Sequence, residues 1–159
     1  MEPLLIYVDV HSIMPVRKPS SSSTHARILL VDDNANGLKA RKTVLEELGY
    51  KTITASCGDD ALELFGRQKF DLVVTDYKMP RMDGLELIAC LRERAPEVPI
   101  VLISGFVEAL GLSEQNTNAD AVIQKSSNEV THLVRSVARL LRVKKPPSPE
   151  RPKAKRKAV

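Results

Sequence analysis

Long apolar segments are missing from this 159-residue sequence, because no run approaches the ~20 residues that a helix needs to cross a bilayer. Cysteine is also scarce: Cys57 and Cys90 are the only two, and they lie far apart without a CxxC spacing. This scarcity argues against a disulfide scaffold and against a zinc site, and it predicts two buried, reduced thiols. Together these absences predict a cytoplasmic protein without a membrane span.

Positive charge is in excess, but it is unevenly distributed. Lys and Arg number 24 against 20 Asp and Glu, which gives a formal net charge of +4 and a pI near 9.1. Residues 144–159 hold seven of the basic residues and one acid, Glu150, so this segment carries +6 and the other 143 residues carry −2. The overall balance therefore does not by itself identify a nucleic-acid-binding protein.

Both ends of the chain have compositions that do not suit a folded core. Residues 1–25 combine a short apolar segment, interrupted by Asp9, with a Ser-rich stretch at 19–24, and we expect a disordered leader and linker there. Residues 144–159 contain four prolines and no Ile, Leu, Phe or Met, and we expect a disordered basic tail. One domain is expected between them, at 26–143, with no room for a separate output domain.

Two kinds of pattern alternate within 26–143. Apolar runs typical of buried strands occupy 28–31, 52–55, 70–75, 100–103 and 121–123. Helical patterns follow the first three strands: one ends at Gly49 with Ala40, Val44, Leu45 and Leu48 on one side, and the next two span 60–67 and 85–94. This alternation predicts a parallel α/β sheet covered by helices on both faces.

The last two helical segments differ in quality. Residues 106–118 predict only a short or poorly formed helix, because Gly111 and a polar run interrupt the pattern. The final helix is well defined, with apolar residues at helical spacing from Val130 to Leu141. Ser126 and Glu129 match a capping box at its start.

Polar side chains stand where four of the predicted strands end. Asp32 and Asp33 follow the first strand, Asp76 the third, Ser104 the fourth and Lys125 the fifth. The carboxyl ends of parallel strands share one edge of a sheet, so these groups should converge on one cleft. Clustered carboxylates need a hard cation such as Mg²⁺ or Mn²⁺. An added lysine and hydroxyl suit a phosphoryl group, which an aspartate can accept as an aspartyl phosphate.

The sequence resembles a response-regulator receiver domain, the phosphoacceptor module of two-component signalling, in a single-domain, chemotaxis-type form. The resemblance covers about 118 residues and implies a flavodoxin-like (βα)5 three-layer sandwich with strand order 2-1-3-4-5. Four stretches carry it: 28–34 (Ile-Leu-Leu-Val-Asp-Asp-Asn), 76–84 (Asp-Tyr-Lys-Met-Pro-Arg-Met-Asp-Gly), 103–105 (Ile-Ser-Gly) and Lys125.

The resemblance implies a role for each matching residue. Asp76 would be the phosphoacceptor, and Asp33, Asp76 and the main-chain carbonyl of Lys78 would bind Mg²⁺ directly, with Asp32 acting through water. Lys125 would pair with a phosphoryl oxygen, and Ser104 would move towards the phosphoryl group. The donor would be a histidine kinase or a phosphotransfer protein, and the output would pass to an unknown downstream protein. Such a module is not an enzyme beyond its own phosphorylation and dephosphorylation.

Several residues around this pattern bear on how the site would work. Ser126 follows Lys125 where the family usually has Pro, which makes a cis peptide bond improbable. Val122 stands where the family often has a switching aromatic residue, so a signal must leave by another route. Phe106 and Lys78 lie two residues beyond Ser104 and Asp76, and we hypothesise that Phe106 shields the acyl phosphate from water. Asp83 and Gly84 are expected to cap the third helix.

Other functions are consistent with parts of the sequence. The basic tail at 144–159 could bind nucleic acid non-specifically or an acidic surface, although no aromatic residue interleaves its charges. The domain could also be a degenerate receiver that acts without phosphorylation. A phosphatase of the haloacid-dehalogenase type is disfavoured, because it needs a second aspartate two residues after the nucleophile, where Lys78 stands.

Overall fold

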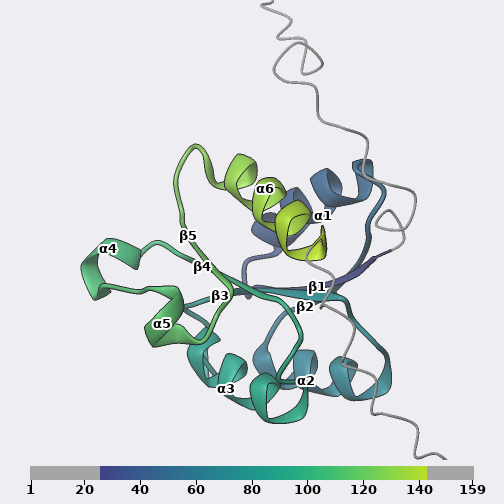
Figure 1. Ribbon diagram of the computed structural model, residues 1–159, viewed down its shortest axis with the longest axis horizontal. Coiled ribbons are helices and arrows are strands. Elements are labelled where there is room, and N and C mark those ends of the chain that lie inside the picture. Colours follow the sequence, from purple (N-terminus) through teal and green to yellow (C-terminus); the bar gives the residue numbers. More distant parts are fainter. Residues whose placement is uncertain (1–25, 143–159) are drawn as a thin grey trace, which may run out of the picture.

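Five parallel strands form the centre of the computed structural model, which describes residues 26–142 (Figure 1). The sheet has the order β2-β1-β3-β4-β5, which confirms the flavodoxin-like sandwich. The expected leader and linker at 1–25 and the expected basic tail at 144–159 lie outside the described residues. The strands are β1 (Arg27–Val31), β2 (Lys51–Ala55), β3 (Leu72–Asp76), β4 (Ile100–Ser104) and β5 (Ala121–Gln124).

Helices cover both faces of this sheet, as the continuous apolar strands predict. Figure 1 shows α1 and α6 on one face and α2 and α3 on the other, with α4 and α5 beside β5. The helices are α1 (Ala35–Glu47), α2 (Gly58–Arg67), α3 (Gly84–Arg94), α4 (Val107–Leu110), α5 (Glu114–Thr117) and α6 (Glu129–Arg142).

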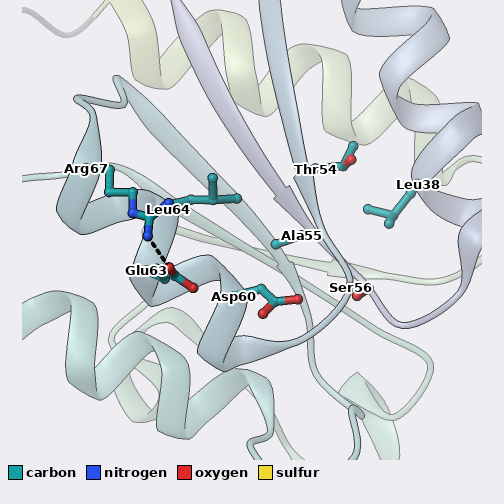
Figure 2. A pocket seen from close by; sticks show the side chains of 8 residues that line it. All are labelled: Leu38, Thr54, Ala55, Ser56, Asp60, Glu63, Leu64 and Arg67. Carbon is teal, nitrogen blue, oxygen red and sulfur yellow. Dashed lines mark ion pairs between the residues drawn. The ribbon is translucent and has the colours of Figure 1, made fainter.

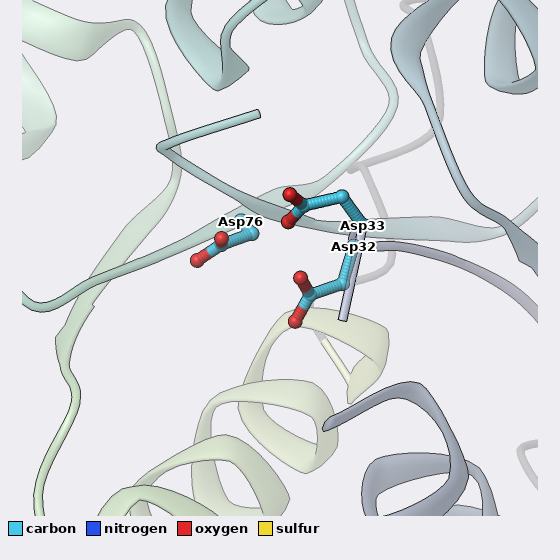
Figure 3. Close-up of side chains that lie close together, drawn as sticks. All are labelled: Asp32, Asp33 and Asp76. Atoms are coloured by element: carbon cyan, nitrogen blue, oxygen red, sulfur yellow. The ribbon is translucent and has the colours of Figure 1, made fainter. Parts of the chain in front are cut away.

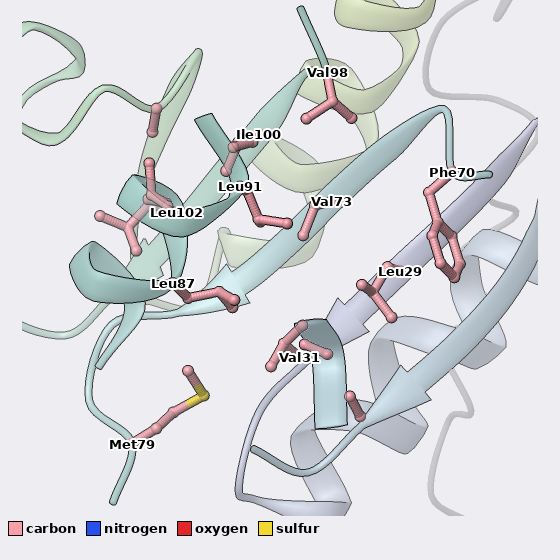
Figure 4. Close-up of a cluster of buried hydrophobic side chains, with 14 residues drawn as sticks. Leu29, Val31, Phe70, Val73, Met79, Leu87, Leu91, Val98, Ile100 and Leu102 are labelled. Atoms are coloured by element: carbon pink, nitrogen blue, oxygen red, sulfur yellow. The ribbon is translucent and has the colours of Figure 1, made fainter. Parts of the chain in front are cut away.

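Successive strand residues point to opposite faces and so divide the core in two. Leu29 and Val73 belong to the cluster under α2 and α3, which Figure 4 shows, whereas Leu30 and Val74 belong to the cluster under α1 and α6. Met79, from the loop after β3, is 7% exposed and packs into the first cluster. The loop that follows Asp76 is therefore anchored in the α2–α3 layer.

The buried face of α1 differs from the predicted one. Leu45 is buried as expected, but Ala40 and Leu48 are exposed, and Arg41 is buried instead. Leu38, Arg41 and Leu45 follow the i, i+3, i+7 spacing of one helix face. The prediction was wrong because it assigned the buried face by apolarity, and a charged residue with two ionic partners occupies it.

The weak fourth helix is confirmed, because residues 107–117 form two helices of four residues each. Gly111 ends α4 in the left-handed conformation, at φ 60°. Ser113 then starts α5 with a capping box, in which its side chain accepts from the Asn116 amide and Asn116 accepts from the Ser113 amide. The polar run therefore forms a capped turn rather than a continuous helix.

Two further local predictions were wrong. Glu129 does not complete a capping box with Ser126, because its carboxylate pairs with Arg41; the Ser126 Oγ accepts from the Asn128 amide instead. Cys57 and Cys90 are free, as expected, but partly exposed rather than buried. Cys57 stands at the N-cap of α2, where its sulfur accepts from the Asp60 amide, and this position keeps it at the surface.

Candidate functional site

Three carboxylates converge at the carboxyl end of the sheet, at the point where the strand order reverses. In the register of β1 and β3, Val31 lies beside Thr75, so the next residues, Asp32 and Asp76, are also neighbours. One oxygen from each of Asp32, Asp33 and Asp76 lies within 4.8 Å of the others. Figure 3 shows the three side chains lying close together. Asp32 and Asp76 are buried, and Asp33 is exposed.

A lysine and a serine lie beside this carboxylate cluster. Lys125, which follows β5, places its Nζ 2.8 Å from Oδ1 of Asp76. That Oδ1 atom is buried, and the Lys125 ammonium group is its charged partner. Ser104 ends β4 and is 1% exposed, and its Oγ accepts from the Phe106 amide at 2.9 Å.

The environment of Asp76 disfavours its charge. Burial raises the pKa of its carboxyl above the ordinary value, and the neighbouring Asp32 raises it further, while Lys125 and Arg41 act in the opposite direction. The net shift is upward, so the single lysine does not fully compensate the buried cluster. A second cation in the pocket would therefore be favourable.

The side chains enclose a pocket of about 390 Å³ that contains every residue predicted for the site. Phe106 lies at its edge, 42% exposed, with Nζ of Lys78 5.3 Å from the centre of its ring. This distance is within the range of a cation–π contact. The lining residues are Asp32, Asp33, Asn34, Asp76, Lys78, Ser104, Gly105, Phe106 and Lys125.

The loop between β3 and α3 depends on a close approach at Gly84. A Cβ at this position would clash with the carbonyl oxygen of Asp76 and lie 3.0 Å from Cδ1 of Leu102. The Gly84 amide donates to the Tyr77 carbonyl at 2.7 Å, which fixes the start of α3 against the end of β3. Asp83 and Glu86 form the capping box of this helix, so the predicted capping role is confirmed.

The sequence did not predict that Arg41 contacts the site residue Asp32 or that Glu129 contacts Arg41. The Arg41 guanidinium donates to Oδ2 of Asp32 at 2.6 Å and to Oε1 of Glu129 at 2.8 Å. Burial lowers the pKa of Arg41, but the bonds to Glu129 and Asp32 outweigh it and raise the pKa overall. The sequence contained one indication of this contact: the charged residue Arg41 lies on the same face of α1 as Leu38 and Leu45.

The oxygen donors in the pocket fit a hard divalent cation. Three carboxylates within one small space offer the ligands that Mg²⁺ and Mn²⁺ prefer. The raised pKa of Asp76 is a second indication, because a bound cation would stabilise the charged carboxylate that burial disfavours. Arg41 already partly neutralises the charge of Asp32, and Lys125 partly neutralises that of Asp76. The remaining negative charge therefore suits one further cation rather than several.

A second hollow, of about 370 Å³, lies beside the carboxyl end of β2 between α1 and α2 (Figure 2). Arg67 and Glu63 pair with each other at its rim, at 2.5 Å. The remaining groups do not form a cluster comparable with the carboxylate site. Its lining residues are Leu38, Thr54, Ala55, Ser56, Asp60, Glu63, Leu64 and Arg67.

A doubly wound parallel sheet with an acidic pocket at the reversal of its strand order places the chain among the α/β domains that bind ligands at the carboxyl ends of their strands. Within that class, the chain belongs to the response regulator receiver domain family of two-component systems, because the model of that family matches residues 28–137. Phosphorylation on an aspartate and Mg²⁺ binding at an acidic pocket are general properties of the family.

Curated relatives are transcriptional regulators. The chain is 34% identical over 128 residues to the alkaline phosphatase synthesis transcriptional regulatory protein PhoP of Bacillus subtilis, covering 77% of the chain and 52% of PhoP. It is 35% identical over 116 residues to the probable transcriptional regulator ycf27 of Porphyra purpurea, covering 71% and 47%. The chain thus spans about half the length of these two relatives.

Solved structures agree with the fold. The response regulator TrrA of Thermotoga maritima, in complex with Mg²⁺ and BeF, has a TM-score of 0.62 and 32% identity, covering 70% of this chain and 98% of TrrA. A CheY-like receiver of Methanospirillum hungatei has a TM-score of 0.68 and 28% identity, covering 74% and 94%. Within residues 26–142, no helix combines the length and apolar character that crossing a membrane requires.

Proposed function

We propose that the chain is a phosphoacceptor of a two-component phosphorelay and that Asp76 carries the phosphoryl group. The observation that carries this proposal is the position of the Asp76 carboxylate. It is buried, it lies within 4.8 Å of two other carboxylates, and Lys125 Nζ is 2.8 Å from its Oδ1. A carboxylate held between a cation-binding cluster and a fixed ammonium group is suited to accept a phosphoryl group, because the ammonium group and a cation held by the cluster would stabilise the charge on the phosphoryl oxygens.

The chain's own residues have distinct parts in this transfer. An oxygen of Asp76 attacks the phosphorus, a P–O bond to Asp76 forms, and the bond from phosphorus to the donor breaks, with the donor nitrogen or oxygen keeping the electron pair. Lys125 pairs with a phosphoryl oxygen, and the Ser104 hydroxyl donates to another after giving up its contact with the Phe106 amide. Hydrolysis later returns the carboxylate and releases inorganic phosphate.

Asp33 and Asp76, with the Lys78 carbonyl, would hold Mg²⁺, and Asp32 would act through water. When bound, Mg²⁺ neutralises phosphoryl oxygens and so lowers the barrier to transfer. Mn²⁺ suits the same donors.

A histidine kinase or a phosphotransfer protein is the donor in this proposal, and a downstream protein in the cytoplasm receives the signal. The relatives are transcriptional regulators by name, but the matched region covers only part of each. We therefore assign the receiver step to this chain and leave the nature of the receiving protein to experiment.

Incubation with acetyl phosphate and Mg²⁺, followed by intact mass measurement, tests the proposal. We expect the wild-type protein to gain the mass of one phosphoryl group and Asp76→Asn to gain none. Asp71→Asn is the matched control, because it makes the same exchange at the opposite end of β3, where the side chain accepts from the Arg27 amide. This control should be labelled like the wild type.

Two results would contradict the proposal. Labelling that persists in Asp76→Asn would place the acceptor elsewhere. A wild-type protein that is never labelled, although it is folded, would instead favour a degenerate receiver that serves as an interaction module.

A further inference from the structure

Arg41 is a buried cation that joins two elements far apart in the sequence. It is 5% exposed, it lies on α1, and its two acidic partners are Asp32 after β1 and Glu129 at the start of α6. Arginine is rarely buried unless it is fully paired. The buried Arg41 charge therefore depends on both Asp32 and Glu129, and its contacts hold both carboxylates in place.

One end of this bridge belongs to the acidic pocket. Oδ2 of Asp32 accepts from Nη1 of Arg41 at 2.6 Å, and Oδ1 accepts from the Asn34 amide at 2.9 Å. Asp32 is 1% exposed, and it is one of the three carboxylates that line the pocket. A cation that enters this space attracts the Asp32 carboxylate and therefore competes with Arg41 for it.

The other end belongs to the turn that leads from the site to the last helix. Oε1 of Glu129 accepts from Nε of Arg41 at 2.8 Å and lies 2.7 Å from Nη2, so one carboxylate oxygen contacts one edge of the guanidinium group. Lys125 lies four residues earlier, and its amide donates to the Ser104 carbonyl at 2.8 Å. Ser126 follows without a cis peptide bond in the described chain, and the turn is closed by the Asn128 amide on the Ser126 Oγ.

We propose that Arg41 is a positioning residue that couples cation occupancy of the acidic pocket to the start of α6. The proposal rests on the proposed function, because it takes the pocket as the Mg²⁺ site. Charge that a cation withdraws from Asp32 weakens its hold on Arg41, and the guanidinium shifts its balance towards Glu129. The first turn of α6 moves in response, which supplies a route out of the site in a chain that has Val122, not an aromatic residue, on β5.

Such coupling is reciprocal by thermodynamic necessity. If a bound cation weakens the contact between Arg41 and Asp32, then that contact must weaken cation binding by the same factor. Replacing Arg41 with an uncharged side chain should therefore tighten Mg²⁺ binding, on the order of fivefold, which is the low end of measured couplings between sites. A residue that merely supported the fold would leave the affinity unchanged or reduce it.

Titration of ¹⁵N-labelled protein with MgCl₂, followed by backbone amide NMR, measures both predictions. In the wild type we expect shifts at residues 32–34 and 76 and also at 129–133. Glu129→Gln keeps the pocket and Arg41, so the pocket shifts should remain while those at 129–133 fall by at least half. Arg41→Met should also lose the shifts at 129–133, and its Mg²⁺ dissociation constant should fall about fivefold.

Arg92→Met is the matched control for the loss of a paired arginine. Arg92 pairs with Asp120 at 2.7 Å and donates to the Val98 carbonyl at 2.6 Å, at the end of the sheet away from the pocket. This substitution should lower stability but leave the Mg²⁺ affinity and the shifts at 129–133 as in the wild type. If Arg41→Met does not fold, Glu129→Gln still decides whether the signal reaches α6.

The outcomes separate this proposal from the proposed function. Shifts confined to the pocket in the wild type, or an Arg41→Met variant that binds Mg²⁺ no more tightly, would overturn the coupling and leave the receiver function standing. A wild-type protein in which millimolar Mg²⁺ moves no amide in the pocket would overturn both.

Discussion

The ammonium group of Lys78 lies 5.3 Å from the centre of the Phe106 ring, so the two side chains form a cation–π contact at the edge of the acidic pocket. The two residues come from the loops after β3 and β4, and Phe106 is 42% exposed. The contact closes one side of the pocket without filling it.

Phe106→Ala should shorten the life of the acyl phosphate, because the ring limits the access of water to Asp76. We expect a two- to fivefold faster loss of the phosphoryl group, which corresponds to about 0.5–1 kcal/mol in the barrier to hydrolysis. The rate is measured from the decay of the phosphorylated mass after removal of the donor. Leu110→Ala is the control, because Leu110 is 52% exposed and does not line the pocket. An unchanged rate in Phe106→Ala would refute the shielding role.

Gly84→Ala should destabilise the protein by about 2 kcal/mol or more, since the new methyl group would press on the Asp76 carbonyl and on Leu102. Gly66→Ala offers the opposite case within α2, because a Cβ there meets no atom within 4 Å. This second change should stabilise by about 0.5–1 kcal/mol, as alanine does in a helix interior. Urea denaturation of both variants checks the pair, and a Gly84→Ala protein as stable as the wild type would show that the loop yields.

The raised pKa of Asp76 makes the metal-free protein sensitive to pH. The folded protein binds this proton more tightly than the unfolded chain does, so stability is lost as the pH rises from the ordinary value of 3.8 through the folded pKa. Asp76→Asn removes the charge, and its Tm should exceed that of the wild type at pH 7 by about 2–5 °C. Near pH 4 the difference should nearly vanish. Thermal unfolding in EDTA measures this, and a wild-type protein that is the more stable of the two at pH 7 would contradict it.

Mg²⁺ should stabilise the folded protein by mass action if the carboxylate cluster binds it. At a concentration ten times the dissociation constant, the free energy of unfolding should rise by about 1.4 kcal/mol. Asp33→Asn removes an exposed member of the cluster and should abolish most of this gain. Asp59→Asn, in the first turn of α2, should keep it. Thermal shifts in MgCl₂ against EDTA give the comparison, and equal gains in Asp33→Asn and the wild type would argue against this ligand.

The sheet and its polar edge were predictable because both depend on local patterns. Short apolar runs rich in β-branched residues, such as 100–103, favour buried strands. A parallel sheet brings the carboxyl ends of such strands together, so the sequence predicts Asp76 beside Asp32. The role of Arg41 was not predictable in the same way. A charge on a buried helix face is tolerated only when distant partners pair with it, and one of those partners, Glu129, lies 88 positions away in the sequence. The sequence pattern also predicted a capping role for Glu129. In the structure its carboxylate accepts from the buried Arg41 guanidinium instead.

The pocket lies on a boundary between two separately packed halves of the molecule. The loop after Asp76 is anchored through Met79 among the side chains of α2 and α3, whereas Asp32 is tied through Arg41 to α1 and α6. Only the sheet lies between these halves. A ligand that binds both Asp32 and Asp76 therefore links the α1–α6 layer to the α2–α3 layer at the carboxyl end of the sheet. Filling the pocket should therefore make the two layers unfold more nearly as one unit.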